Sequence, residues 1–246
     1  MTHLPAIQLY TVREAMAEDR AGTLRRLADI GYGAVEAHRP TDDPAGFRTL
    51  TEDLGLKVCA AHAGDAVGNP EPGPVFEAIA SLGTELAVVP GGRPKEDRST
   101  PDGIERIAGE VNRLLPYAQA AGLHLGYHNH DHELTGIDGR YALDLLLDQV
   151  DLAVFLEVDT YWAAAGGADV PELLSWYGDR VKVLHLKDGP GVRGPANVAL
   201  GEGSLPIADY VATAPDAWRV VEFDKCETDI FDAVARSHDY LARLAN

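Results

Sequence analysis

Residues 27–38, LADIGYGAVEAH, contain the pattern that decides the fold. A segment with helical spacing ends at Gly31, a residue type suited to the left-handed conformation that closes many helices, and a short apolar run follows. The same order occurs in TEDLGLKVCAAH (51–62), IASLGTELAVVP (79–90) and AQAAGLHLGYHNH (118–130). A helix, a glycine and a strand thus alternate along the chain, which predicts parallel strands joined by helices.

The whole chain can be divided in this way. We expect strands near 5–10, 34–38, 57–63, 86–90, 123–129, 153–159, 181–186 and 219–223. We expect helices near 18–30, 44–54, 74–82, 101–121, 141–149, 170–178, 207–213 and 229–244. No Pro-, Gly- or Ser-rich linker divides these units, so they favour one α/β domain over 1–246, a single (β/α)8 TIM barrel. The first turn, LYTVREAM, lacks glycine, which disfavours a dinucleotide-binding doubly wound sheet.

Composition limits the class of protein and its partners. With 246 residues, 46% of them hydrophobic, the chain can bury a large core. Its formal net charge of -18 opposes binding to a nucleic-acid backbone. We find no signal-peptide pattern and no apolar stretch long enough to span a membrane. Cys59 and Cys226 lack metal-ligand spacing. We therefore expect a soluble cytoplasmic protein without nucleic-acid or membrane partners, and leave a homo-oligomer open.

Polar side chains follow most of the predicted strands. Active sites of TIM barrels gather where the strands end and the next loops begin. Seven of the eight predicted strands end in His, Asp, Glu or Gln, and the set includes Gln8, Glu36, His62, His128, Asp159, His185 and Glu222. This convergence predicts a polar site at the mouth of the barrel.

Three of these residues suit a metal ion. Asp159, His185 and Glu222 end neighbouring strands, and a mixed oxygen and imidazole set suits Mn²⁺, Mg²⁺, Co²⁺ or Zn²⁺. Strand alternation places His128 and His130 on one face, so either can supply a fourth ligand, and we predict that His128 is this ligand.

A site without metal is the alternative. The two acids would then be barrel carboxylates paired with Lys187 or Lys225, and His185 would be a hydrogen-bonded core histidine. Burying several acids without partners is costly, which favours a cation.

Six motifs carry a family resemblance. In order, IQLYTVRE, YHNHDHEL, LEVDTYWA, VLHLKDG, LGEG and VVEFD resemble the sugar phosphate isomerase/epimerase family, the xylose-isomerase-like TIM barrels, over essentially the whole chain. The resemblance implies a divalent metal held by one residue from each of the last four strands. Asp159, His185 and Glu222 match three positions, whereas His128 stands where many members have Glu. Glu157, one pleat deeper than Asp159, could supply the missing carboxylate.

Glu157 also has a structural alternative, as a buried acid bonded to Lys182 or Lys187.

The resemblance also implies an activity. We expect an isomerase or epimerase acting on an unphosphorylated sugar or keto-sugar through a metal-stabilised enediolate. Glu222 and His130 would transfer protons, and Lys187 would stabilise negative charge on a substrate oxygen or, alternatively, pair with Asp188. Substrate contacts are expected from Gln8, Glu36, His62, Glu133, Glu157 and Trp162.

Two other functions stay open. A lyase or dehydratase acting on a keto-inositol or a 3-keto-glycoside needs the same enolate and then expels a β-oxygen. A barrel that binds sugar without turnover is the non-enzymatic alternative. The net charge argues against the DNA-cleaving branch of the superfamily, which uses zinc.

Overall fold

Eight parallel strands close into a barrel in the computed structural model, which describes residues 3–91 and 94–244. Their order around the barrel is β1-β10-β9-β8-β5-β4-β3-β2. The strands are β1 (Ala6–Gln8), β2 (Ala34–Ala37), β3 (Lys57–His62), β4 (Leu86–Val89), β5 (His124–His128), β8 (Phe155–Asp159), β9 (Val181–Leu186) and β10 (Trp218–Val221). The predicted (β/α)8 barrel is confirmed.

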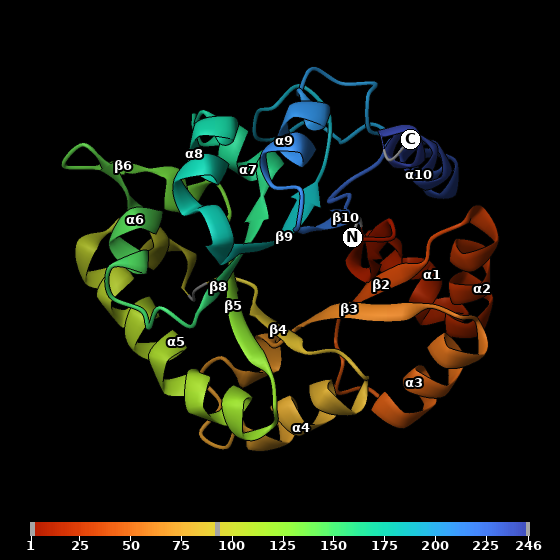
Figure 1. Ribbon diagram of the computed structural model, residues 1–246, viewed down its shortest axis with the longest axis horizontal. Coiled ribbons are helices and arrows are strands. Elements are labelled where there is room, and N and C mark those ends of the chain that lie inside the picture. The colour runs from red at the N-terminus through yellow and green to blue at the C-terminus, as the bar shows by residue number, and fades with distance from the viewer. Residues whose placement is uncertain (1–2, 92–93, 245–246) are drawn as a thin grey trace.

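Helices surround the strands, as Figure 1 shows. They are α1 (Arg13–Glu18), α2 (Arg20–Ile30), α3 (Pro44–Asp53), α4 (Gly73–Ser81), α5 (Pro101–Ala120), α6 (Ala142–Leu147), α7 (Thr160–Ala165), α8 (Val170–Tyr177), α9 (Ile207–Thr213) and α10 (Ile230–Leu244). Each long helix buries an apolar stripe, for example Leu24 and Leu27 of α2, while its other face stays in water. The main core therefore lies between the helices and the outer face of the barrel.

A second core fills the inside of the barrel. It consists of small and medium side chains around Phe155, from the earlier parts of the strands. A Cβ atom added at Gly126 would lie 2.4 Å from the Phe155 ring, so glycine at this position leaves space for the aromatic side chain. Because this apolar floor blocks the lower barrel, the polar residues that end the strands are held above it.

The structure departs from the predicted elements in four places. The first strand ends at Gln8 and is followed by a 3-10 helix, Leu9–Val12. Helices α1 and α7 were not predicted, although Asp159 is a recognisable N-cap whose side chain accepts from the Trp162 amide at 2.9 Å. A hairpin of β6 (Gly136–Ile137) and β7 (Arg140–Tyr141) was also missed.

Its turn, Asp138-Gly139, has positive φ at both residues (49° and 83°), which is the conformation that Asp-Gly favours in tight hairpins.

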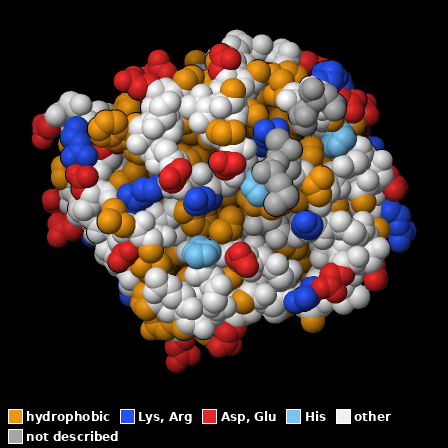
Figure 2. Space-filling view, in the orientation of Figure 1, with side chains coloured by type: hydrophobic (Ala, Val, Ile, Leu, Met, Phe, Trp, Pro, Cys, Tyr) orange, Lys and Arg blue, Asp and Glu red, His pale blue; other side chains and the backbone are white. Residues whose placement is uncertain are grey.

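The described helices include none that is long and apolar enough to cross a membrane. On the face seen in Figure 2, Lys and Arg side chains lie singly among Asp and Glu and form no continuous basic patch.

Candidate functional site

A cavity of about 520 Å³ opens at the carboxyl ends of the strands. Five predicted site residues line it: His62, His128, His130, Lys187 and Glu222. Tyr10, His38, Arg39 and Asp224 line it as well, although we had assigned them no role. The first three follow β1 and β2, so the early loops form one wall, and the residues after β5, β9 and β10 form the other.

The side chains of Asp159, His185 and Glu222, called the outer group below, lie together as predicted. One ligand atom from each lies within 4.8 Å of the other two. His185 Nδ1 lies 2.8 Å from Glu222 Oε2. Asn129 fixes the end of β8 because its side chain accepts from the Asp159 amide at 3.0 Å. The outer group therefore joins β8 and β9 to the residue that follows β10.

Lys187 is the counter-ion of the outer group. Its Nζ lies 2.9 Å from Asp159 Oδ2, 2.8 Å from Glu222 Oε2 and 2.8 Å from Asp224 Oδ2. Three carboxylates around one ammonium leave a formal charge of about -2, which one divalent cation would balance.

Lys187 forms no ion pair with Asp188, which we had considered as its alternative partner. Asp188 instead accepts from the backbone amides of Gly189, Gly201 and Gly203, and so holds the LGEG loop.

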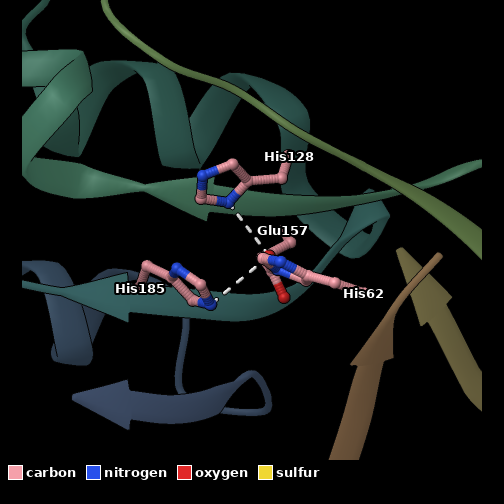
Figure 3. A group of neighbouring side chains, drawn as sticks. All are labelled: His62, His128, Glu157 and His185. Carbon is pink, nitrogen blue, oxygen red and sulfur yellow. Dashed lines mark hydrogen bonds and ion pairs between the residues drawn. The ribbon is translucent and has the colours of Figure 1, made fainter. Parts of the chain in front are cut away.

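His62, His128 and Glu157, called the inner group below, lie deeper in the barrel. In Figure 3 the three labelled histidines point toward the Glu157 carboxylate, from β3, β5 and β9. Glu157 Oε2 lies 3.0 Å from His62 Nε2, 2.9 Å from His128 Nδ1 and 3.3 Å from His185 Nε2. Neither Lys182 nor Lys187 pairs with Glu157, so its partners are imidazoles.

Glu36 completes this buried network from β2. Its carboxylate lies 2.6 Å from His185 Nε2 and 3.1 Å from His62 Nε2. The strand register shifts at Glu36, between β2 and β3, and at Glu157, between β8 and β9. In each case the partner strand carries the extra residue, Cys59 in β3 and Lys182 in β9. Both acids are fully buried, so they face the histidines and do not line the cavity.

Burial and charge shift the pKa values of the four acids in opposite directions. Burial, together with the neighbouring Glu36, raises the pKa of Glu157 to about 7. Burial raises the pKa of Asp159 to about 6, although Lys187 opposes this shift. Burial would also raise the pKa of Glu36 and Glu222, but nearby imidazoles and, for Glu222, the Lys187 ammonium hold both below the usual range.

The histidines divide in the same way. Burial opposes protonation of His62, yet Glu36 and Glu157 raise its pKa to about 10. The pKa of His185 is raised by the same carboxylates and by Glu222, despite burial. His128 has a pKa below the usual range because of burial and the neighbouring His185. Burial and the charge of Arg98 lower the pKa of His130 to about 3, which leaves a neutral imidazole facing the cavity.

Besides Glu36 and Glu157, three further predicted contact residues lie away from the cavity lining. Gln8 is buried, and its side chain accepts from the Tyr10 amide at 3.2 Å. Glu133 is also buried, and it accepts from the Tyr127 hydroxyl and the His130 amide at 2.7 and 3.0 Å. The ring of Trp162 lies 5.5 Å from Lys187 Nζ, behind the outer group. These contacts orient residues that do reach the cavity.

The outer group fits a divalent metal by its donor chemistry. Two carboxylates and one imidazole are ligands that Mn²⁺, Mg²⁺ and Zn²⁺ all accept. Asp159 Oδ2 is buried and forms no hydrogen bond of good geometry among the described residues; its ionic contacts are with Lys187 Nζ at 2.9 Å and, more distantly, His128 Nε2 at 3.9 Å. An acceptor with spare coordination capacity is what a ligand needs.

Comparison with known proteins supports the family and the fold. The model of the family described as xylose isomerase-like TIM barrel matches residues 24–216. An inosose dehydratase from Geobacillus kaustophilus is 29% identical over 188 residues, which are 67% of this chain and 60% of that protein. The matched stretch thus spans less than two thirds of that relative's length.

Two solved structures share the architecture. A sugar phosphate isomerase/epimerase from Parabacteroides distasonis is 23% identical, with a TM-score of 0.79 over 98% of this chain and 94% of its own. A xylose isomerase-like TIM barrel protein from Mycobacterium smegmatis, solved in complex with magnesium, is 14% identical, with a TM-score of 0.69 over 99% and 96% of the two chains. The matched family model covers most of the barrel described above, and the chain belongs to the xylose isomerase-like TIM barrel family.

Proposed function

We propose that this protein is a divalent-metal-dependent enzyme that removes a proton beside the carbonyl of a keto-sugar and then eliminates a β-hydroxyl as water. The observation that carries the proposal is the contact of 2.8 Å between Lys187 Nζ and Glu222 Oε2, both in the cavity wall. It places a base and an acid side by side. The dehydratase relative from Geobacillus kaustophilus supports this choice of reaction.

The residues can carry the proton transfers in order. The Glu222 carboxylate takes the α-proton of the substrate, and an enolate forms. The Lys187 ammonium protonates the leaving β-hydroxyl, so one C–O bond breaks and water leaves. The proton on Glu222 then passes to the Lys187 amine across their 2.8 Å contact, which restores both groups.

Asp159, His185 and Glu222 are the residues that would hold the metal. When bound, a divalent ion supplies a Lewis acid that polarises the substrate carbonyl and stabilises the negative charge of the enolate. His130, which is neutral and also lines the cavity, would bind a hydroxyl group. Its Nδ1 is buried and forms no hydrogen bond among the described residues.

Isomerisation or epimerisation is the second candidate. Epimerisation requires proton transfer on both faces of the substrate, and His130, which also lines the cavity, is the candidate for the second group. The similarity to an inosose dehydratase is the reason that we rank elimination first.

The two reactions differ in their products. Protein loaded with Mn²⁺ is incubated in D2O with a keto-inositol, a 3-keto-glycoside and a ketose. Elimination produces a conjugated enone, which is detected by its ultraviolet absorbance. Epimerisation instead incorporates deuterium into a sugar that has lost no water. Absence of both reactions, with sugar binding retained, would contradict the proposal and favour a binding protein.

A further inference from the structure

The inner group faces a common point with donor atoms that the reaction above does not use. His62 Nε2 and His128 Nδ1 lie 3.0 and 2.9 Å from the same oxygen, Glu157 Oε2. One ligand atom from each residue lies within 4.8 Å of the others. The rings of His62 and His128 are 5.6 Å apart between centroids, so the imidazoles converge without stacking.

Hydrogen bonding satisfies these atoms only in part, through the 3.0 Å bond between His62 Nε2 and Glu157 Oε2. Among the residues that the structure describes, His128 Nδ1 and Glu157 Oε1 are buried and lack a hydrogen-bond partner, since the short contact of His128 has unfavourable direction. His62 Nε2 faces both Glu157 and Glu36, and one N–H cannot donate fully to two carboxylates. Buried polar atoms without partners are rare and call for an explanation.

We propose that His62, His128 and Glu157 form a second divalent-cation site, separate from the outer group. Two imidazoles and one carboxylate are the protein ligands of many open zinc and iron sites. Ligand atoms around a tetrahedral Zn²⁺ are about 3.3 Å apart, so each donor need only move outward by a few tenths of an ångström. His62 and His128 both line the cavity, which leaves the fourth position accessible to water or substrate.

The two sites need not share a ligand atom. His185 presents Nδ1 to Glu222 in the outer group, and its Nε2 lies 2.6 Å from Glu36. An Nε2–H bond to Glu36 would hold this histidine in the tautomer that leaves Nδ1 free for the outer ion. His128 offers Nδ1 to the inner site and turns Nε2 toward Asp159, 3.9 Å away.

The ligand types predict different metal preferences. Imidazole-rich sites favour Zn²⁺ and Co²⁺, whereas Mg²⁺ prefers oxygen ligands. The inner site should therefore bind Co²⁺ and exclude Mg²⁺, while the outer site accepts both. Neither expectation depends on which reaction the enzyme catalyses.

The test counts bound metal after equilibrium dialysis with Co²⁺ alone or Mg²⁺ alone. We expect about two Co²⁺ and about one Mg²⁺ per wild-type chain. Glu157→Gln should retain one Co²⁺ and one Mg²⁺, whereas Asp159→Asn should retain one Co²⁺ and lose Mg²⁺. The matched control Glu172→Gln, on the exposed face of α8, should bind metal as the wild type does.

Visible absorption during the Co²⁺ titration gives a second readout, with two phases in the wild type and one in Glu157→Gln. Thermal melts in chelator check folding, and His62→Asn replaces Glu157→Gln if the latter does not fold. One Co²⁺ per wild-type chain, lost in Asp159→Asn and retained in Glu157→Gln, overturns the second site and leaves the proposed function intact. One Co²⁺ lost in both variants overturns it as well, because the two groups then form one site. A wild type that binds one Co²⁺ and no Mg²⁺, with that Co²⁺ lost in Glu157→Gln and retained in Asp159→Asn, contradicts the proposed function instead, because the outer group then holds no ion.

Discussion

The outer and inner groups lie in one barrel mouth, yet they balance charge by different means. Lys187 neutralises the outer carboxylates and stands in the cavity wall beside them. Among residues 3–91 and 94–244, the ionic partners of the inner carboxylates, Glu36 and Glu157, are imidazoles, and both acids lie behind the wall. An ammonium keeps its charge over the physiological pH range, whereas an imidazolium loses its proton to solvent when the ring binds a metal. The kind of counter-ion thus changes with depth below the barrel mouth, from an ammonium in the cavity wall to imidazoles beneath it.

Glu222→Gln should have the largest effect on turnover. Glutamine keeps the shape of the side chain but cannot accept the α-proton, so we expect kcat to fall about 10²- to 10⁴-fold. Steady-state kinetics with the best substrate measures the loss, and a thermal melt shows that the fold is kept. A fall as large in Glu157→Gln would erase the distinction between the two groups.

Lys187→Met should have the largest effect on stability. It leaves three carboxylates without their ammonium, and breaking a buried ion pair costs about 3–5 kcal/mol. Urea unfolding in chelator at pH 8 measures the loss. Mn²⁺ should restore much of it, because a divalent ion replaces the missing charge. A stability unchanged in chelator would show that Lys187 is not the counter-ion of the outer group.

Glu36→Gln should weaken metal binding by a moderate amount. Glu36 lies 2.6 Å from His185 Nε2, and loss of a carboxylate behind a ligating histidine lowers metal affinity about 10- to 100-fold. Competition with a fluorescent chelator gives the dissociation constant independently of activity. Unchanged affinity for Mg²⁺, which only the outer group should bind, would separate Glu36 from that group.

The smallest expected effect is on the pH dependence of stability in the absence of metal, and Asp159→Asn tests it. The folded-state pKa of Asp159 is about 6, above its ordinary value of 3.8. Folding therefore favours its protonated form, so its contribution is full below about pH 4 and is lost as pH rises through about 6. Asparagine does not titrate and still caps α7.

In chelator, the melting temperature of Asp159→Asn relative to wild type should thus increase from pH 4.5 to pH 7.5. A difference that is constant with pH would contradict the raised pKa.

Residues at strand ends were the part of the site that could be predicted. Asp159, His185 and Glu222 end consecutive strands, and parallel strands of a barrel bring such ends together. Glu36 and Glu157 were expected to contact substrate, but both are buried below the cavity lining and face the histidines. Their partners lie on strands distant in the sequence, and the pairing register between such strands leaves no mark in the pattern of either strand alone, so these partners could not be predicted.

Asp224 shows a signal that was present and not used. It follows Glu222 by two residues, so strand alternation places both on one side, and both contact Lys187. The hairpin of β6 and β7 was also marked in advance by its Asp-Gly turn. Both signals lie within a few neighbouring residues, and patterns of this short range can be recognised in a single sequence.

The sequence by itself determined the order of helices and strands, the barrel and the cluster of acids and histidines at its mouth. These follow from local periodicity and from the common direction of parallel strands. Only the tertiary structure decided which carboxylate faces which imidazole. Glu36 and His185 are 149 residues apart, and their contact depends on barrel closure and on two register shifts. Because the positions of all eight strands determine how the barrel closes, this contact depends on the whole barrel and not on any single segment.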